Sequence, residues 1–342
     1  MKKIVIIGAG AMGSAFAVPC LDNKNDVTIV GTHLEDNLIE SINSNNHLHP
    51  ALKTQLPKEI KFERFEKLQN ILKQNIDIIV CGVSSVGIEW FVQQISKKYK
   101  KKIPIVLLTK GLSIVDNELS TLSDKIKNLL EKEGHSEINI SAIKGPCLAA
   151  GLANKMRTGT VIANKNLKEC QFLKETISTN YYSTEISEDI NGVELSGAIK
   201  NIYSMLIGAS EGLSNPKASK DIQSKYFLNT AASLIHRSIS EMVEFVSNYG
   251  GKAETVYGLA GLGDLYVSAI GGRNSLMGKY LGEGYLYNDA KEKFMKDITV
   301  EGAQLALEIG PRILEDLNSK NFPLMFSMLN TICENKKLEI NW

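Results

Sequence analysis

The sequence has few cysteines, and no two of them stand at the spacing of a metal-binding pair. Its 342 residues include only five, at positions 20, 81, 147, 170 and 333. Single, scattered thiols exclude a disulfide framework and a cysteine-based zinc site, and they are typical of a reducing compartment. His47 and His49 are close in sequence, but no acid or cysteine pair at metal spacing surrounds them. We therefore interpret them as part of a surface loop and expect no metal site.

Long apolar runs and an excess of one charge are also absent. No apolar stretch reaches the roughly 20 residues that a membrane span needs. The first strand-like run begins at Lys3, which leaves no room for a signal peptide. The 39 Lys and Arg nearly balance the 38 Asp and Glu, and the net charge of +1 predicts no strong field for nucleic acid or an anionic membrane. We interpret the basic run at 97–102 as a solvated helix end, and expect a cytoplasmic protein with no nucleic-acid partner.

A glycine-rich motif follows the first apolar run. Residues 3–7 are typical of a buried strand, G-x-G-x-x-G follows at 8–13, and a second apolar run at 27–30 lies one crossover helix further on. In this context the motif indicates the opening βαβ unit of a dinucleotide-binding domain. Gly8 permits the tight turn, Gly10 lets the backbone approach a pyrophosphate, and Gly13 lets the helix pack on the strand. The flanking strands disfavour the alternative, a glycine-rich turn without a ligand.

The first half of the chain alternates strand-like and helix-like patterns, which predicts a mostly parallel sheet covered by helices. Helices are expected around Trp90 and from Asp116 to Glu133. Further strands are expected at residues 76–83, 103–108, 138–143, 160–163 and 184–187.

Strand patterns end near Asp189, and amphipathic helical patterns take over. The expected helices cover residues 191–207, 226–249, 275–280, 299–309, 310–318 and a segment near the C-terminus. A chain of 342 residues is also longer than one core usually organises. We predict an α/β protein: a Rossmann-like, mostly parallel sheet in a dinucleotide-binding domain at 1–188, then an all-helical domain for substrate and catalysis at 189–342.

Open parallel sheets bind their ligands beyond the carboxyl ends of the strands. The residues that directly follow each predicted strand are therefore candidates for a site. Besides the glycine motif, they are Gly31-Thr32-His33, Ser84-Ser85, Lys110-Gly111 and Gly145-Pro146. A lysine and several small turn residues thus fall on one predicted edge.

In the helical half, Lys200 stands in an otherwise apolar segment, between Ile199 and Asn201-Ile202. A buried lysine has a lowered pKa, which suits it to proton transfer near neutral pH. The alternative is a lysine whose stem lies along apolar surface while its ammonium group reaches solvent. This segment alone slightly favours that alternative.

Two glycine-rich segments follow. Residues 258–263 contain three glycines and precede a single acid, Asp264. Gly-Gly-Arg-Asn at 271–274 then precedes a helical pattern, so Arg273, Asn274 and the helix N-terminus together offer donors to an anion. An acid, a lysine and an anion-binding segment with an arginine together form a catalytic set for a small phosphorylated substrate.

These residues lie in motifs that resemble those of the NAD(P)-dependent glycerol-3-phosphate dehydrogenases over nearly the full length of the chain. The matching motifs are G-A-G-A-M-G at 8–13, K-G at 110–111, G-P-x-x-A at 145–149, V-E-L-x-G-A-x-K-N at 193–201, G-L-A-G-L-G-D-L at 258–265, G-G-R-N at 271–274 and V-E-G at 300–302. Seven matches in the same order are hard to obtain by chance.

The resemblance implies reversible hydride transfer from NAD(P)H to dihydroxyacetone phosphate, giving sn-glycerol 3-phosphate, which the family often makes for phospholipid synthesis. It implies that Lys200 protonates the carbonyl oxygen, that Lys110 is its partner, and that Asp264 orients the catalytic lysine. Ser268 stands where many members have Thr, so a hydroxyl is kept. The implied substrate contacts are Lys110, Lys200, Asn201, Ser268, Arg273 and Asn274.

The cofactor contacts come from the glycine motif, the second strand end and the resemblance. They are Gly8, Ala9, Gly10, Ala11, Met12, Gly13, Thr32, His33, Lys110, Ala149, Arg273 and Glu301. NAD enzymes of this fold usually place an acid at the end of the second strand, but Thr32 and His33 occupy that corner here. Glu35 and Asp36 come late and are expected only to cap the next helix. No Arg stands there either. The cofactor is therefore NAD or NADP, with a slight preference for NADP or dual use.

Two other classes stay open from the residues alone. One is a related dehydrogenase for another small hydroxy acid, and the other is a non-catalytic NAD(P) sensor. The Gly-Gly-Arg-Asn segment argues against the first, and the presence of Lys110, Lys200 and Asp264 argues against the second. The apolar faces of the helical domain and the resemblance suggest a homodimer.

Overall fold

The computed structural model describes the backbone of residues 1–99, 103–214 and 220–341, and the side chains of all of these except 220–226. They form two compact units, one made of Met1–Lys110 with Thr121–Ile190 and the other of Gly111–Ser120 with Asn191–Trp342. The division at residue 188 was expected from sequence alone and stays a prediction; a single boundary there does not account for residues 111–120.

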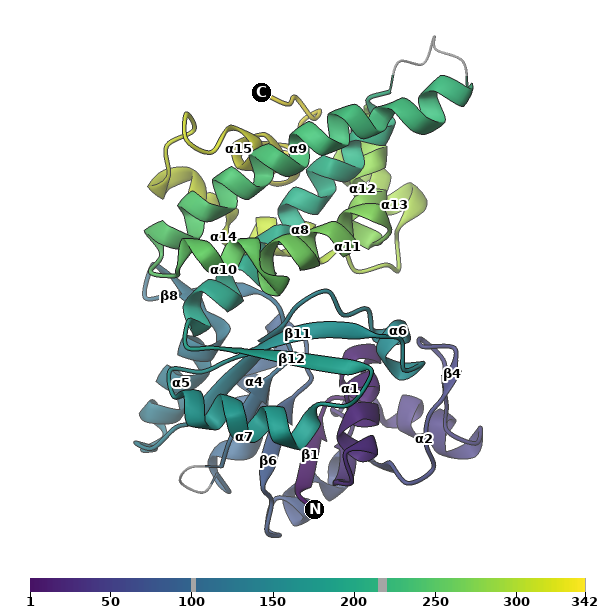
Figure 1. The fold of residues 1–342 in the computed structure, drawn as a ribbon, viewed down its shortest axis with the longest axis vertical. Helices are drawn as coiled ribbons and strands as arrows, with labels where there is room; N and C mark the ends of the chain where they lie inside the picture. The colour runs from purple at the N-terminus through teal and green to yellow at the C-terminus, as the bar shows by residue number, and fades with distance from the viewer. Residues whose placement is uncertain (100–102, 215–219, 342) are drawn as a thin grey trace. The chain divides into compact units, whose positions relative to one another are not determined.

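The first unit is built on one eight-stranded sheet with the order β12-β11-β10-β7-β6-β1-β2-β5 (Figure 1). Its strands are β1 (Lys3–Ile7), β2 (Asp26–Val30), β5 (Lys61–Glu63), β6 (Ile78–Cys81), β7 (Ile105–Leu107), β10 (Ile140–Lys144), β11 (Thr158–Ala163) and β12 (Tyr182–Ser187). All neighbours are parallel except β10 and β11. Since β1 lies between β2 and β6, its carboxyl end is the point where such sheets bind ligands. The predicted α/β class is confirmed.

Alternating side chains of β1 bury both faces of the sheet. Ile4 and Ile6 belong to one apolar core, and Val5 and Ile7 belong to another on the opposite face. The first core includes residues of α1 (Ala11–Asp22), α2 (Asp36–Ser44) and α7 (Leu167–Ile177), and the second includes residues of α4 (Ile88–Ser96) and α5 (Leu122–Lys132). A continuous apolar strand is what a sheet covered on both faces requires.

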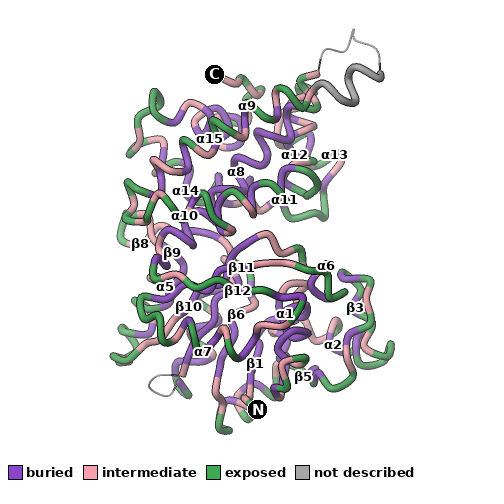
Figure 2. The backbone as a smooth tube through the Cα atoms, viewed as in Figure 1, coloured by how far each residue is buried: buried purple, intermediate pink, exposed green. Residues whose placement is uncertain are grey.

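The second unit is helical around α8 (Ile190–Gly212), which is buried along nearly its whole length (Figure 2). Its other helices are α9 (Lys220–Asn248), α10 (Ala253–Tyr257), the π-helical turn η3 (Leu259–Gly263), α11 (Asp264–Ile270), α12 (Arg273–Gly282), α13 (Tyr287–Phe294), α14 (Glu301–Asp316) and α15 (Pro323–Cys333). A Cβ on Gly278 would lie 1.9 Å from the carbonyl oxygen of Met205, so only glycine lets α12 approach α8 this closely. None of the helices in the described ranges has both the length and the apolar composition that crossing a lipid bilayer would take.

The expected helix from Asp116 is wrong in its first residues. A hairpin of β8 (Leu112–Val115) and β9 (Glu118–Thr121) precedes α5. Asp116 and Asn117 have φ values of 51° and 65°, and two such residues in a row form the turn that suits a two-residue hairpin. Asp and Asn tolerate this left-handed conformation better than other side chains. The hairpin belongs to the helical unit, where Leu112 joins the core.

Two further features differ from the expectations, and a third agrees with them. The two helices expected at 299–309 and 310–318 are one helix, α14, which continues through Pro311 because its buried face extends from Leu305 to Ile313. The edge strand β5 was not expected. Helix α4 ends at Ser96, and Lys97 and Lys98 after it are exposed, as expected of a solvated helix end. Residues 100–102 of that basic run lie outside the described part of the chain.

Candidate active site

The glycine motif forms the turn between β1 and α1, and its three glycines have different roles. Gly8 has a φ of 110°, and a Cβ there would lie 2.8 Å from the carbonyl carbon of Gly82. A Cβ on Gly13 would lie 2.5 Å from the Gly8 oxygen. Gly10 is different: a Cβ there would meet only Glu35 Oε1, at 3.9 Å. Two glycines thus shape the turn, and the third leaves its outer face open.

Gly10 is also the N-cap of α1, and no side chain among the described residues caps that helix. The first-turn N–H groups of a helix carry a positive dipole end and suit a phosphate group. The open face at Gly10 and the uncapped helix therefore fit the pyrophosphate of a dinucleotide. Ala11 and Met12, which open α1, are the expected donors.

The peptide groups of Ala9 are held from both sides. The Ala9 N–H donates to Glu35 Oε2 at 3.1 Å, and its carbonyl accepts from Ser14 Oγ at 3.0 Å. His49 Nε2 lies 3.0 Å from the same carbonyl, and His49 Nδ1 accepts from the Leu52 N–H at 3.3 Å, which places the ring proton on Nε2. His49 is only 1% exposed, so the surface-loop interpretation is wrong for it. It braces the glycine turn instead.

Thr32 and His33 follow β2 at the same edge of the sheet. The Thr32 N–H donates to Glu35 Oε2 at 2.7 Å. The His33 ring lies 5.3 Å from that of Trp90 and 6.1 Å from that of Phe65, measured between centroids. The side chain of Glu35 makes no cap bond to α2, so the expectation that it only caps this helix is wrong. The sequence showed no sign of this aromatic cluster, because its members come from three different segments.

Lys110 follows β7, and its Nζ lies 3.5 Å from the Gly145 carbonyl oxygen. A second lysine was missed: Lys144 ends β10, is 2% exposed, and donates from Nζ to the carbonyls of Thr109 at 2.8 Å and Leu107 at 3.2 Å. It thereby fixes the backbone just before Lys110. A lysine that closes a buried strand was the signal that could have identified it. Ala149 begins α6 (Ala149–Ala153) and is partly buried.

In the helical unit, Lys200 is buried and paired. It is 4% exposed, and its Nζ lies 2.6 Å from Oδ1 of Asp264, which is 1% exposed. The same Nζ donates to Ser268 Oγ. Asp264 and Ser268 are one turn apart on α11, directly after the π-helical turn, a feature often found at functional sites. The alternative of a lysine reaching solvent is wrong.

The other predicted residues of this unit form two pairs. Asn274 Nδ2 donates to Asn201 Oδ1 at 3.0 Å, and Asn274 Oδ1 accepts from the Gly302 N–H at 2.8 Å. Arg273, in the first turn of α12, forms an ion pair with Glu301, and both side chains are partly exposed. The buried amides thus hold the starts of α12 and α14 against α8, while Arg273 stays near solvent. Lys110 belongs to the first unit and all these residues to the second.

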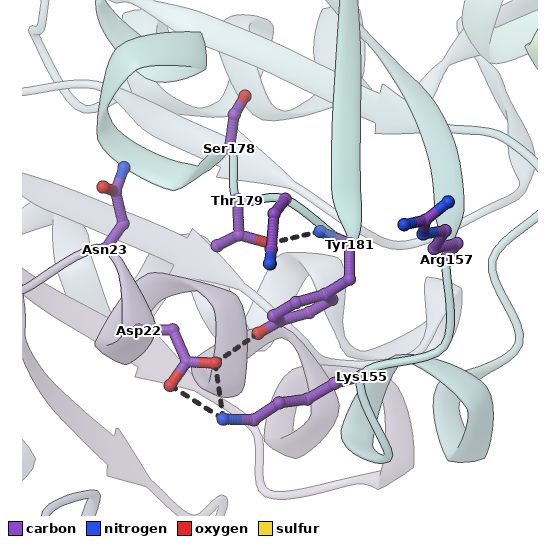
Figure 3. Close-up of a pocket in the computed structure, with 8 residues that line it drawn as sticks. Asp22, Asn23, Lys155, Arg157, Ser178, Thr179 and Tyr181 are labelled. Atoms are coloured by element: carbon purple, nitrogen blue, oxygen red, sulfur yellow. Dashed lines mark hydrogen bonds and ion pairs between the residues drawn. The ribbon is translucent and has the colours of Figure 1, made fainter.

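A separate cavity of about 670 Å³ lies at the other end of α1 (Figure 3). Asp22 accepts there from Tyr181 Oη at 2.7 Å and from Lys155 Nζ at 2.8 Å. Burial and the Asp22 carboxylate raise the pKa of Tyr181. The full lining is Asp22, Asn23, Lys155, Arg157, Ser178, Thr179, Asn180 and Tyr181. No residue expected to bind substrate or cofactor is among them, so this cavity is not the predicted site.

A dinucleotide-binding sheet and a helical unit with a buried lysine–carboxylate pair are the parts of a two-domain dehydrogenase. Family models described as NAD-dependent glycerol-3-phosphate dehydrogenase N-terminus and C-terminus match residues 3–170 and 189–340. The NADP(+)-dependent glycerol-3-phosphate dehydrogenase of Archaeoglobus fulgidus is 33% identical over 338 residues, which are 98% of this chain and 96% of that protein.

The NAD(P)+ glycerol-3-phosphate dehydrogenase of Mesoplasma florum is 32% identical over 96% of this chain and 93% of its own. The crystal structure of glycerol-3-phosphate dehydrogenase from Coxiella burnetii has a TM-score of 0.79 and 25% identity, covering 98% of this chain and 96% of that one. The chain belongs to the NAD-dependent glycerol-3-phosphate dehydrogenase family, and it is an oxidoreductase that uses NAD or NADP. These matches support neither a dehydrogenase for another hydroxy acid nor a non-catalytic NAD(P) sensor, the two classes that the residues alone left open.

Proposed function

We propose that this protein reduces dihydroxyacetone phosphate to sn-glycerol 3-phosphate, reversibly, and that the product serves glycerophospholipid synthesis. The observation that carries the proposal is the buried contact of Lys200 with Asp264 and Ser268. A ketone reduction needs a proton donor at the carbonyl oxygen, and a buried ammonium group suits that task. The nicotinamide cofactor supplies the hydride when it is bound.

Each residue of the cluster has a separate task in the proposed reaction. Lys200 donates a proton from Nζ to the carbonyl oxygen as the hydride reaches the carbonyl carbon, so that a hydroxyl group forms, and solvent later returns a proton to the lysine. Asp264 and Ser268 hold the ammonium group in one position. Lys110 is proposed as a second cation for the substrate, and Lys144 holds the carbonyl group of Thr109, the residue just before it.

Binding is assigned to the remaining predicted residues. Arg273 and Asn274 are proposed for the substrate phosphate, with Asn201 beside the reacting carbon. Residues 8–13 are proposed for the pyrophosphate, and Thr32 and His33 for the adenosine side. Ala149 is proposed for the nicotinamide carboxamide, and Lys110, Arg273 and Glu301 are proposed as further cofactor contacts. The Arg273–Glu301 ion pair places these two proposed ligand-binding side chains next to each other.

The test is an initial-rate assay with dihydroxyacetone phosphate, run separately with NADH and NADPH. Turnover with either cofactor is expected. A different result would be that calorimetry shows binding of at least one cofactor while neither cofactor is oxidised. The substrate assignment would then be wrong, and a dehydrogenase for another hydroxy acid or a sensor would be the better hypothesis.

Replacing Arg273 with alanine is expected to raise the KM for dihydroxyacetone phosphate at least about tenfold, since a charge-assisted contact to phosphate contributes on the order of 1.5–3 kcal/mol. The side chain is 54% exposed, so folding should be little affected. Steady-state kinetics with varied substrate measure the effect, and Arg312→Ala, which removes a partly exposed arginine paired with Asp316 and Glu315, is the control. An unchanged KM and kcat would remove Arg273 from the phosphate site.

The cytoplasm is the proposed location, and the five cysteines, all of which are free thiols in the structure, are compatible with its reducing conditions. A homodimer is the proposed assembly. Light scattering coupled to size-exclusion chromatography tests this, and a mass near 37.6 kDa would mean a monomer.

A further inference from the structure

We infer that Glu35 makes this enzyme select NAD over NADP, an inference that rests on the proposed function of the glycine turn as a dinucleotide site. Glu35 lies five residues beyond the end of β2, later than the acid that usually contacts the ribose in this fold. In the structure its carboxylate nevertheless reaches the corner between the glycine turn and the end of β2.

The two carboxylate oxygens of Glu35 are in different situations. Oε2 accepts from the N–H groups of both Ala9 and Thr32, at 3.1 and 2.7 Å. Oε1 makes no hydrogen bond or ion pair within the described residues, and it lies 3.9 Å from where a Cβ on Gly10 would be. The carboxylate is therefore fixed through one oxygen, and the other borders the open face at Gly10 that fits the dinucleotide.

This arrangement distinguishes the two cofactors chemically. A ribose 2′-hydroxyl can donate a hydrogen bond to Oε1, whereas a 2′-phosphate brings a second anion to a fixed carboxylate. The phosphate also finds the nearby backbone donors taken, because the Thr32 and Ala9 N–H groups already donate to Glu35. The slight preference for NADP was based on the absence of an acid at the end of the second strand. Since the Glu35 carboxylate occupies that corner, this reason no longer applies.

One cation near this corner, Arg64, would favour NADP instead, so the test must include it. Arg64 directly follows β5, the strand that pairs with β2, so it is the alternative partner for a 2′-phosphate. Its guanidinium is paired with Glu40 Oε2 at 2.9 Å. Binding NADP through Arg64 would require breaking this pair while the Glu35 carboxylate stays in place. His33 is exposed beside the same corner and packs against Phe65 and Trp90.

The experiment is calorimetric titration of the full-length protein with NAD+ and with NADP+, without substrate. The wild type is expected to bind NAD+ at least about tenfold more tightly, which corresponds to about 1.4 kcal/mol. Glu35→Gln should strengthen NADP+ binding at least about tenfold and weaken NAD+ binding. Glu66→Gln removes the same charge from an exposed neighbouring position, so its ratio of dissociation constants should equal that of the wild type.

Two results would overturn the inference. The first is that the wild type binds NADP+ more tightly than NAD+. If Arg64→Gln then abolished this preference for NADP+, Arg64 would be the selecting residue. The second is an equal loss of both cofactors in Glu35→Gln, which would mean that Glu35 only braces the turn. Failure of the proposed function is a separate result: it would show as no turnover of dihydroxyacetone phosphate with either cofactor, whatever the binding ratio.

Discussion

A Lys200→Ala variant is expected to lose at least about 100-fold in kcat with dihydroxyacetone phosphate, the usual scale for removing a general acid. The physical reason is the position of its ammonium group, which is buried and held by Asp264 and Ser268. Water that replaces it would be a weaker and less oriented proton donor. Dissociation constants for NADH should change little, because Lys200 is assigned to the substrate and is not among the proposed cofactor contacts.

Removing Lys200 alone takes the counter-charge away from the buried Asp264 carboxylate, a change that commonly costs about 3–5 kcal/mol of stability. The kinetic result therefore needs a second variant, Lys200→Met with Asp264→Asn, which removes both charges and keeps similar volumes. It should melt closer to the wild type and still lack activity. Lys279→Ala, which breaks a surface pair with Glu211, serves as the control. Near-normal kcat in a folded Lys200 variant would show that another group donates the proton.

Much of the fold was predictable because its signals are local in sequence. The strand at 3–7, the glycine turn and the strand near 27–30 are contiguous, and periodicity alone indicates them. The hairpin at 112–121 was missed for a different reason. Its Asp-Asn turn lies directly before a strong helical pattern, and the hairpin is stabilised by packing of Leu112 in the helical unit, which no local pattern reveals.

The candidate site shows the same limit at the level of side chains. The family resemblance implied that Asp264 orients Lys200, but no local pattern shows this contact, because it depends on how α8 packs on α11, 64 residues away in sequence. Glu35 and His49 were placed in a helix cap and a surface loop because neither has a local sign of contact with Ala9. Tertiary hydrogen bonds to a backbone turn leave no periodic trace, so sequence reasoning found the turn but not the side chains that hold it.

The second large effect is expected for stability: Glu241→Ala should lower the free energy of unfolding by at least about 3 kcal/mol. Glu241 lies on α9, is 1% exposed, and accepts from the N–H groups of Leu324 at 2.9 Å and Met325 at 3.0 Å. It also accepts from Tyr203 Oη at 3.1 Å. One carboxylate thus satisfies the first turn of α15 and joins it to α8 and α9, and alanine would leave three buried donors without an acceptor.

The pH dependence of that effect follows from burial, which raises the pKa of Glu241 above its ordinary value of 4.5. A carboxyl group with a raised folded-state pKa binds its proton more tightly in the folded protein. Its contribution to stability is therefore complete below pH 4.5 and declines as the pH rises through the folded-state value. Chemical denaturation across this pH range measures the free energy of unfolding of the wild type and of Glu241→Ala. The difference between these two free energies should become smaller as the pH rises.

Glu244→Ala is the matched control for this measurement, because Glu244 lies one turn away on α9 and accepts an exposed hydrogen bond from Asn321. Its effect should stay below about 1 kcal/mol at every pH, as is usual for exposed polar contacts. The opposite result would be a difference in the free energy of unfolding that grows with pH. It would mean that the ionised carboxylate is stabilised more by the three donors and by Arg237, whose Nε lies 3.7 Å from Glu241 Oε1, than burial disfavours it.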